Sequence, residues 1–155
     1  VLFRSGVRKM YLRGELEKVH AGVYTLKNDL PDDIQKEDIY KTLALTSGTQ
    51  CIIGIVPLTS HLSEKKLAKA AGYKKVSMIP QKDLQKTTGY VHGANNPVGI
   101  HQKHQFPIFI DKVALDNPLM IVSAGEVGRS IRINPQELAT FVHATFADIC
   151  ETHLA

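Results

Sequence analysis

The chain has 155 residues, of which 43% are hydrophobic, and a formal net charge of +4. A chain of this length can bury a core without disulfides or metal, so we expect one globular domain over residues 1–155. No stretch approaches the roughly 18 consecutive apolar residues of a transmembrane helix, which argues against a membrane protein. The mild basic excess fits a partner that carries phosphates, but it also fits a plain soluble protein.

The two cysteines, Cys51 and Cys150, stand far apart in apolar surroundings and show no metal-ligand spacing. We therefore expect buried, reduced thiols in a cytoplasmic protein rather than a disulfide. Three basic residues occur within the first ten positions, but no apolar segment of the signal-peptide type follows them. We expect no signal peptide and assign no function to this stretch.

The first part of the chain gives weak structural signals, and the next part gives a clear one. Residues 11–19 fit a short helix or the start of a strand, residues 21–27 are weakly strand-like, and residues 28–38 predict a loop with a helical turn. Residues 39–46 then alternate in β fashion, and the apolar run at residues 51–57 predicts a strand buried on both faces. These two segments predict a hairpin inside a sheet.

Helices and short strands are expected in the remainder of the chain. A helix is predicted between His61 and Gly72 with Ser63 as its N-cap, and a C-terminal helix that continues to Ile149 is predicted to begin at Asn134. The other expected elements are strands at 74–80, 105–110, 119–124 and 130–133, and a helical turn at 81–86. The predicted fold class is therefore α+β, with a mixed, mostly antiparallel sheet flanked by helices.

The stretch KTTGYVHGANNPVG, residues 86–99, is unusual because it holds three Gly, two Asn and one Pro but no acidic residue. Such a composition predicts a loop with tight turns between strand-like segments. Its backbone N–H groups could face an anion or a carbonyl group without a Cβ in the way. An ordinary long hairpin connection is equally consistent with this composition.

Lys41 interrupts an otherwise apolar or hydroxylated strand, so it is the most conspicuous single residue. Strand alternation places it on the same face as Leu43 and Leu45, and Tyr40 and Thr42 on the opposite face. The ammonium must then either reach solvent or meet an anion in a cleft. The alternative is an edge-strand lysine that protects against aggregation.

Neutral hydrogen-bonding side chains surround this loop, and they suit the binding of a polar substrate, although turn capping would also explain them. They are Thr87, Thr88, Tyr90, Asn95, Asn96 and Ser123. His92, His101 and His104 lack the spacing of a zinc site, and no GxSxG, P-loop or GxGxxG motif occurs. We therefore expect no metal and no cofactor, while a triad assembled in space stays open.

Several segments together resemble the YbaK/EbsC family of aminoacyl-tRNA deacylases, which is related to the insertion domain of bacterial prolyl-tRNA synthetase. The resemblance covers residues 39–149, and its segments are IYKTLAL, KKVSMIP, QKTTGYVHGANNPVG, FPIFID, IVSAGEVGRSIRI, NPQELATF and FADI. It implies a mixed, partly closed β-sheet flanked by helices. It also implies hydrolysis of mischarged Cys-tRNA(Pro) in trans, with the 3′ acceptor end of tRNA as partner and prolyl- or cysteinyl-tRNA synthetase as a second one.

The resemblance also implies roles for individual residues. Lys41 matches the lysine on which the activity of the family depends. The expected substrate-binding residues are Thr42, Tyr90, Gly93, Asn96, Pro97, Gly99, Ser123 and Gly125. Ala94 and Asn96 stand where the family usually has glycine and serine, which leaves the amino acid that is removed unsettled.

The resemblance implies a substrate-assisted mechanism in which the cysteinyl thiol attacks its own ester. The enzyme then needs only to hold that geometry and to stabilise the oxyanion with backbone N–H groups near Gly93. Two alternatives stay open: a catalytically weak tRNA- or synthetase-binding module of the same fold, and a hydrolase of small acyl esters.

Overall fold

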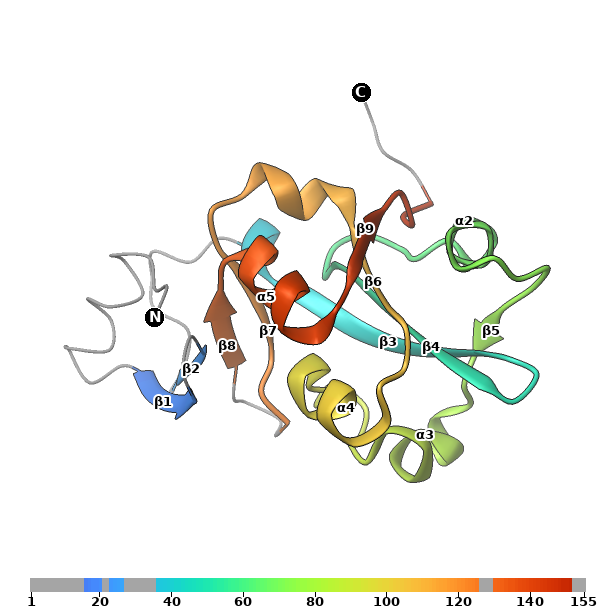
Figure 1. The fold of residues 1–155 in the computed structure, drawn as a ribbon, viewed down its shortest axis with the longest axis horizontal. Helices are drawn as coiled ribbons and strands as arrows, with labels where there is room; N and C mark the ends of the chain where they lie inside the picture. Colours follow the sequence, from blue (N-terminus) through green and yellow to red (C-terminus); the bar gives the residue numbers. More distant parts are fainter. Residues whose placement is uncertain (1–15, 21–22, 27–35, 126–129, 152–155) are drawn as a thin grey trace.

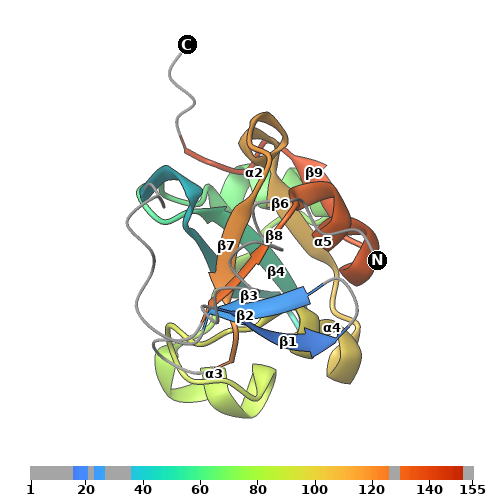
Figure 2. The same ribbon diagram turned by 90° about the vertical axis from the view of Figure 1, so that its left-hand side faces the viewer.

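The computed structural model describes residues 16–20, 23–26, 36–125 and 130–151, and the strands in this part of the chain form two sheets (Figure 1). The strands are β1 Leu16–His20, β2 Val23–Leu26, β3 Tyr40–Ser47, β4 Gln50–Pro57, β5 Ser77–Met78, β6 Ile108–Asp111, β7 Met120–Ser123, β8 Ser130–Ile133 and β9 Thr145–Ala147. The five-stranded sheet has the order β5-β3-β4-β6-β9, and the four-stranded sheet has the order β1-β2-β8-β7. Figure 2 looks onto the side of the molecule where β1, β2, β7 and β8 lie.

Strand pairing follows the predicted mixed, mostly antiparallel pattern, with the parallel pairs confined to the five-stranded sheet. The strands of the smaller sheet pair antiparallel, whereas β6 pairs parallel with both β4 and β9. The β3–β4 hairpin runs in register from Tyr40↔Pro57 to Ser47↔Gln50 around a turn at Gly48, whose φ of 60° suits glycine. Among the described residues, the isolated bridge Ile39↔Ile121 connects β7 of the smaller sheet to the residue that precedes β3. The predicted α+β class with a mixed, mostly antiparallel arrangement is confirmed.

Short helices connect these strands. They are η1 Lys36–Asp38, α2 Glu64–Ala71, α3 Gln81–Thr88, α4 Pro97–His104, η2 Lys112–Asp116 and α5 Pro135–Val142. The predicted caps of α2 are confirmed: the Ser63 side chain accepts a hydrogen bond from the Lys66 amide, and Gly72 ends the helix with φ 82°. In α5, the Asn134 side chain caps the first turn and Pro135 follows it, also as predicted.

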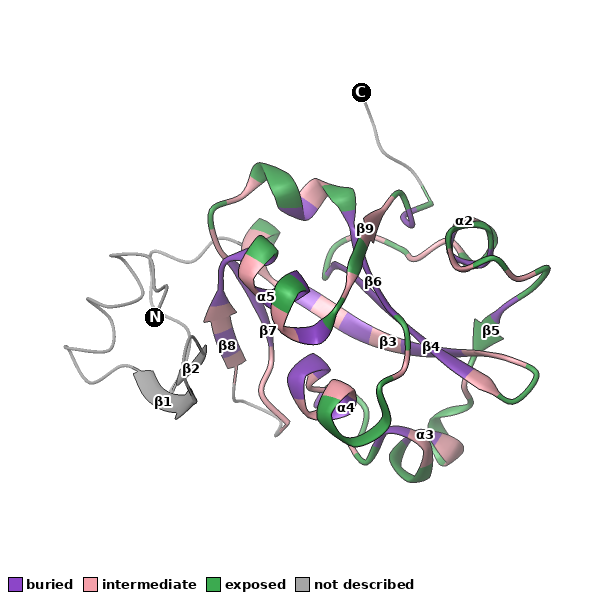
Figure 3. Cartoon of the chain, in the orientation of Figure 1, coloured by how far each residue is buried: buried purple, intermediate pink, exposed green. Residues whose placement is uncertain are grey.

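Two clusters of buried side chains cover the two faces of the five-stranded sheet. One cluster contains Tyr40 and Ala44 of β3 together with residues of α4, α5, β7 and β8. The other contains Leu45 of β3 and Leu67 of α2. Strand β4 lies between β3 and β6 and is buried along nearly its whole length (Figure 3), which confirms the prediction of a strand buried on both faces.

The stretch of residues 86–99 differs from its prediction as one long loop between strands. Helix α3 extends to Thr88 and α4 begins at Pro97, so the loop comprises only residues 89–96 and joins two helices. Asn96 caps α4, because its side-chain oxygen accepts from the amides of Val98 (2.9 Å) and Gly99 (3.4 Å). A helix over residues 97–104 was not predicted.

The C-terminal helix is shorter than predicted, and the prediction of a helix up to Ile149 is wrong. His143 adopts a left-handed conformation with φ 55° and ends α5, after which β9 joins the sheet beside β6. The buried carboxylate of Asp111 then accepts hydrogen bonds from the amides of Ile149 (2.9 Å) and Cys150 (3.2 Å). These bonds hold the segment after β9 in an extended course instead of a helical one.

Smaller differences concern the ends of elements. The strand expected at residues 74–80 is only β5, two residues long, while β2 confirms the weak strand signal at 21–27. Of the ambiguous stretch 11–19, residues 16–19 belong to β1; residues 1–15 and 27–35, including most of the predicted loop at 28–38, lie outside the described residues.

The cysteines are free and buried, as predicted, and burial raises the pKa of the Cys51 thiol from 9.0 to about 11. In the described part of the chain, no helix is long and apolar enough to span a membrane.

Candidate active site

A pocket of about 460 Å³ lies against β3, between the two sheets and beside α3. Its lining brings together polar and apolar groups from six parts of the chain. They are Ile39, Tyr40, Lys41, Thr42, Leu43, Ala44, Leu58, Met78, Ile79, Gln81, Leu84, His92, Gly93, Asn95, Ile121, Val122, Ser123 and Ser130. This volume falls in the range of small-molecule sites, which makes the pocket the candidate active site.

The pocket exists because one edge of β3 has no partner strand over residues 40–44. On that edge β3 meets β7 only at the bridge Ile39↔Ile121, and it meets β5 only at Leu45 and Thr46. Between these two points, no strand among the described residues pairs with it. We call residues 40–44 the open edge of β3. Because side chains alternate along a strand, a ligand at this edge can be contacted from both faces of the sheet.

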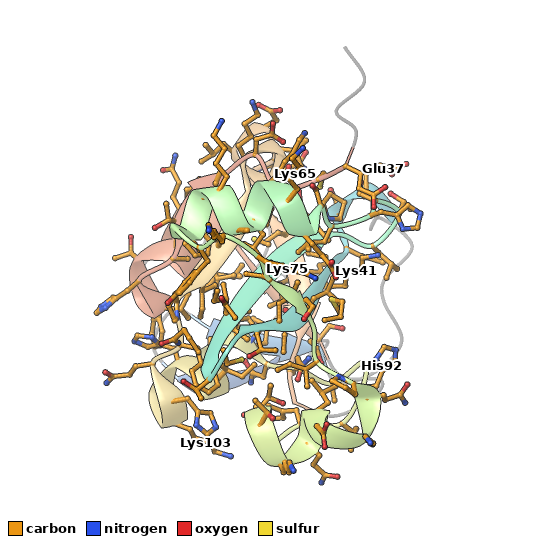
Figure 4. The ribbon with its side chains drawn as sticks, turned by 90° about the vertical axis from the view of Figure 1, so that its right-hand side faces the viewer. Glu37, Lys41, Lys65, Lys75, His92 and Lys103 are labelled. Atoms are coloured by element: carbon orange, nitrogen blue, oxygen red, sulfur yellow. The ribbon has the colours of Figure 1, made fainter. Side chains whose placement is uncertain are left out.

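Lys41 lies on the open edge, on the face predicted from strand alternation. Leu43 and Leu45 belong to the cluster under α2, whereas Tyr40 and Ala44 belong to the opposite cluster. Lys41 itself is half-buried and lines the pocket; Figure 4 labels it on the side of the molecule where His92 is also seen. Lys41 therefore contributes one positively charged side chain to the β3 wall of the pocket.

Thr42 points to the other face of β3 and is nearly inaccessible, with 7% of its surface exposed. Its Oγ1 atom is buried without a hydrogen-bond partner among the described residues. Leaving a buried hydroxyl unpaired costs about 1–3 kcal/mol, so such groups need a reason. Thr42 also lines the pocket.

The loop between α3 and α4 forms the wall that faces β3. His92 and Gly93 line the pocket, and Gly93 adopts φ 84°, a left-handed conformation that favours glycine. The Ala94 amide donates to the Val91 carbonyl (3.0 Å), which closes a tight turn around Gly93. Gly93 has no side chain, so its contribution to the pocket wall consists of main-chain atoms.

Asn96, Pro97 and Gly99 do not line the pocket. They form the first turn of α4, where Asn96 is the N-cap and Pro97 the first helical residue. The side-chain oxygen of Asn96 therefore caps a helix, which is the alternative to substrate binding that the sequence left open for this residue. Any role of these three residues in substrate binding would act through the orientation of α4.

Tyr90 also lies outside the pocket lining and packs between two glycines. A Cβ on Gly99 would overlap the Tyr90 hydroxyl, and one on Gly125 would lie 3.0 Å from the ring. The Lys103 ammonium lies 5.2 Å from the centre of the same ring, within cation–π range. Tyr90, Gly99 and Gly125 therefore pack the start of the loop against the end of β7.

Ser123 reaches the pocket from the end of β7, and Ser130 faces it from the paired position on β8. The Ser123 hydroxyl oxygen accepts a weak hydrogen bond from the Gly125 amide at 3.5 Å. Of the predicted site residues, the pocket thus brings together Lys41, Thr42, Gly93 and Ser123.

Sequence reasoning did not select several lining residues, notably Asn95, Ser130 and Tyr40. The Tyr40 hydroxyl lies 3.5 Å from the Asn117 side-chain amide, and burial raises its pKa, so this group stays protonated at neutral pH. Asn95 was noted in the sequence only as one polar residue of the loop, because nothing distinguishes it there from the adjacent Asn96. Among the described residues, no group of three or more His, Cys, Asp or Glu could hold a metal ion.

The groups that line this pocket suit the binding and orientation of a polar ligand, and they include the imidazole of His92. Its wall offers a cation, hydroxyl groups and main-chain groups beside apolar side chains such as Ile79 and Leu84. Such a site suits a small polar molecule that is already activated for reaction, because positioning and electrostatic stabilisation alone lower a barrier substantially.

Comparisons with known proteins agree with this description. The family model described as "Aminoacyl-tRNA editing domain" matches residues 20–141. The chain is also 39% identical, over 117 residues, to a curated protein of Enterococcus faecalis named EbsC, a candidate Cys-tRNA(Pro)/Cys-tRNA(Cys) deacylase. This alignment covers 75% of the present chain and 70% of that protein.

Two solved structures share the fold at low sequence identity. A candidate trans-editing enzyme for prolyl-tRNA synthetase superimposes with a TM-score of 0.75 at 19% identity, covering 98% of this chain and 100% of its own. The hypothetical protein APE2540 gives a TM-score of 0.73 at 18% identity, covering 96% and 100%.

Proposed function

This chain belongs to the aminoacyl-tRNA editing domain family, and on that premise we propose that it hydrolyses the ester bond of a mischarged aminoacyl-tRNA, with Cys-tRNA(Pro) as the substrate. Membership confirms the family that the sequence motifs predicted. The choice of cysteine follows the name of the relative from Enterococcus faecalis, which is described as acting on Cys-tRNA.

The observation that supports a polar ester as ligand is the unpartnered Thr42 hydroxyl beside Lys41. The two residues are adjacent on the open edge of β3, and both line the pocket. An acylated terminal nucleotide offers the complementary groups, since its ester and ribose oxygens accept hydrogen bonds and its phosphate oxygens carry negative charge. In this proposal Thr42 donates to an ester or ribose oxygen, and Lys41 neutralises a phosphate or the developing oxyanion.

The proposed reaction needs no attacking side chain from the protein. The sulfur of the cysteinyl group attacks its own ester carbonyl carbon, and the bond from that carbon to the ribose oxygen breaks. The ribose oxygen takes up the proton that the thiol gives up, which leaves free tRNA and a cyclic thiolactone that water then opens to cysteine. Main-chain groups at the Gly93 turn stabilise the oxyanion of the intermediate, while the pocket wall restricts the acyl group to a reactive conformation.

Exposed lysines beside the pocket support a polynucleotide as the carrier of the ester. Met78 lines the pocket, and its amide donates to the Glu64 carboxylate (3.3 Å), which ties the start of α2 to β5. The segment between these two points contributes four exposed lysines: Lys65, Lys69, Lys74 and Lys75. Figure 4 labels Lys65 and Lys75 on the side of the molecule that also holds Lys41. Cations in this place would attract the phosphates of an acceptor stem whose 3′ end enters the pocket.

The experiment that tests this function measures release of free tRNA from a panel charged with Cys, Ala, Ser or Pro, with the same amino acids on an adenosine ester as a second set. We expect release from Cys-tRNA(Pro) above the others, and a rate that falls steeply with salt for tRNA but little for the adenosine ester. Release of another amino acid would correct the substrate. If every tRNA stays charged, the chain is not a deacylase, and salt-dependent tRNA binding without release would identify a binding module.

A further inference from the structure

Asn95 is a buried polar residue of the pocket wall whose side chain bridges two elements. It is 5% exposed, and its two side-chain polar atoms both have partners. Its Nδ2 donates to the carbonyl oxygen of Thr42 on the open edge of β3 (3.0 Å), and its Oδ1 lies 3.0 Å from the Thr88 Oγ1 at the end of α3. One side chain thus connects the loop to both neighbouring walls.

The orientation of the Asn95 amide follows from its partners. The Thr42 carbonyl can only accept a hydrogen bond, so the nitrogen of the amide must face it. The oxygen then faces Thr88, whose hydroxyl can donate to it. The Thr88 hydroxyl oxygen in turn accepts a hydrogen bond from the Tyr90 amide (3.1 Å). Besides Asn95 Oδ1, the Thr88 hydroxyl has two further acceptors within reach, the carbonyl oxygens of Leu84 (3.1 Å) and Tyr90 (3.3 Å).

A continuous chain of hydrogen bonds therefore runs from the start of the loop to β3: the Tyr90 amide to Thr88, Thr88 to Asn95, and Asn95 to the Thr42 carbonyl. The residue at its far end is the one whose hydroxyl has no partner among the described residues. The residues between Tyr90 and Asn95 include Gly93, the turn that faces the pocket. The distance between the Gly93 turn and Thr42 is thus fixed by buried, directional bonds.

We propose that Asn95 is a positioning residue for the ester cleavage: it holds the Gly93 turn and the Thr42 hydroxyl at the separation that the reacting acyl group requires. The inference rests on the proposed function and gives a positioning role to a residue that the sequence indicated only as one of several polar groups around the loop. Asn95 acts through the two walls that it joins, because both of its polar atoms are engaged with protein. A displacement of about 1 Å between such walls is enough to lower a rate up to about 100-fold.

Asn134 offers a matched control elsewhere in the fold. It is 8% exposed, its Nδ2 donates to the Pro118 carbonyl (3.0 Å), and its Oδ1 accepts from the amides of Gln136 and Glu137. It therefore resembles Asn95 in burial and bonding, but it does not line the pocket beside β3. Asn95→Ala removes two buried side-chain hydrogen bonds and Asn134→Ala removes three, but only Asn95 lines the pocket.

The test compares wild type, Asn95→Ala and Asn134→Ala in the full chain, with steady-state deacylation of Cys-tRNA and urea unfolding measured for each. Both variants should lower the urea midpoint. Asn95→Ala should lower kcat about 10- to 100-fold with little change in KM, because the substrate still binds but is held less well. Asn134→Ala should change kcat by less than about two-fold at a temperature where it is folded.

Two further variants give readouts that a merely structural role would not move. Asn95→Asp keeps an acceptor toward Thr88 but loses the donor toward the Thr42 carbonyl until its carboxyl is protonated. Its rate relative to wild type at the same pH should therefore rise as the pH falls. Thr88→Val breaks the chain without altering Asn95 and should reproduce the loss of kcat, while Thr88→Ser should restore it.

The outcomes separate this inference from the proposed function. If wild type is active and Asn95→Ala loses no more activity than Asn134→Ala, Asn95 is structural only and the inference fails while the function stands. A rise in KM at constant kcat would also overturn it, because that result would mean direct substrate binding. An inert wild type would remove both. Should Asn95→Ala fail to fold, Thr88→Val against Thr88→Ser decides the question.

Discussion

The two halves of β3 differ in what lies beside them, and their residues differ accordingly. Leu45 and Thr46 have strands on both sides, β4 and β5, and Leu45 is fully buried. In the other half, Lys41 and Thr42 pair with no described strand except β4, and they line the pocket. The same strand thus serves as sheet interior over one half and as the wall of the candidate site over the other. Substitutions in the two halves should separate stability from activity.

Lys41 should show the largest effect on activity. Lys41→Ala removes the cation at the open edge of β3, and we expect deacylation to fall about 100- to 1000-fold, as for loss of one group that stabilises developing charge. Lys41→Arg keeps the charge in a different shape and should retain more activity than Lys41→Ala. The measurement is single-turnover release of tRNA, with urea unfolding as the check on the fold. Wild-type turnover by Lys41→Ala would exclude a catalytic role.

Leu45 should show the converse behaviour. Leu45→Ala removes most of a fully buried side chain and leaves a cavity, so the free energy of unfolding should fall by about 2–5 kcal/mol. Urea unfolding measures that loss. The deacylation rate of the folded fraction should stay within a few-fold of wild type, and a drop as large as that of Lys41→Ala would contradict the division of β3 into two halves.

The hairpin around β3 and its burial could be predicted because periodicity reports them directly. Alternation over residues 39–46, followed by a nearly continuous apolar run, gave the two strands and the side of the strand on which Lys41 lies. The open edge could not be predicted, because it depends on where β5 and β7 stop pairing with β3. That information lies in long-range contacts and not in the sequence of β3 itself.

Helix α4 shows how a correct signal can be overlooked. Asn96–Pro97 is the same N-cap and first-turn pair as Asn134–Pro135, which did predict α5. For α4, Gly99 and the two glycines before it favoured the prediction of a loop. The N-cap signal of Asn96–Pro97 was therefore given too little weight. Asn95 and Asn96 show a second limit of prediction from sequence. Their side chains are chemically identical, but in the fold Asn95 bonds to the Thr42 carbonyl and Asn96 caps α4.

Cys51 lies opposite Thr46, in the half of the hairpin that is paired on both sides, and gives a pH-dependent prediction. Burial raises the pKa of its thiol from 9.0 to about 11 in the folded chain. Below pH 9 the thiol is protonated in both states, so its contribution to stability is full. Between pH 9 and 11 only the unfolded chain loses the proton, and stability should fall by about 2 kcal/mol.

Urea unfolding of wild type and Cys51→Ala at pH 8 and pH 10.5 measures this contribution. Other groups that titrate in this range, including Cys150, remain in both proteins, so the difference between the two pH profiles isolates Cys51. Cys51→Ala should lose less stability than wild type between these two pH values. Parallel profiles would show that the thiol is more accessible than its 4% exposure indicates.

Thr42 gives a smaller expected loss of rate than Lys41, but it gives the sharpest distinction between a residue kept for the fold and one kept for a ligand. Thr42→Val replaces the buried hydroxyl with a methyl group of similar size. Because Oγ1 has no partner among the described residues, the substitution should leave stability unchanged or raise it. Loss of one hydrogen bond to the substrate should lower kcat/KM about ten-fold, and Thr42→Ser should restore it.

Thr46→Val, in the other half of β3, should leave kcat/KM unchanged. A Thr42→Val variant that is less stable but fully active would mean that the hydroxyl serves the fold; one that is stable but slow would mean that the open edge of β3 is held for a substrate.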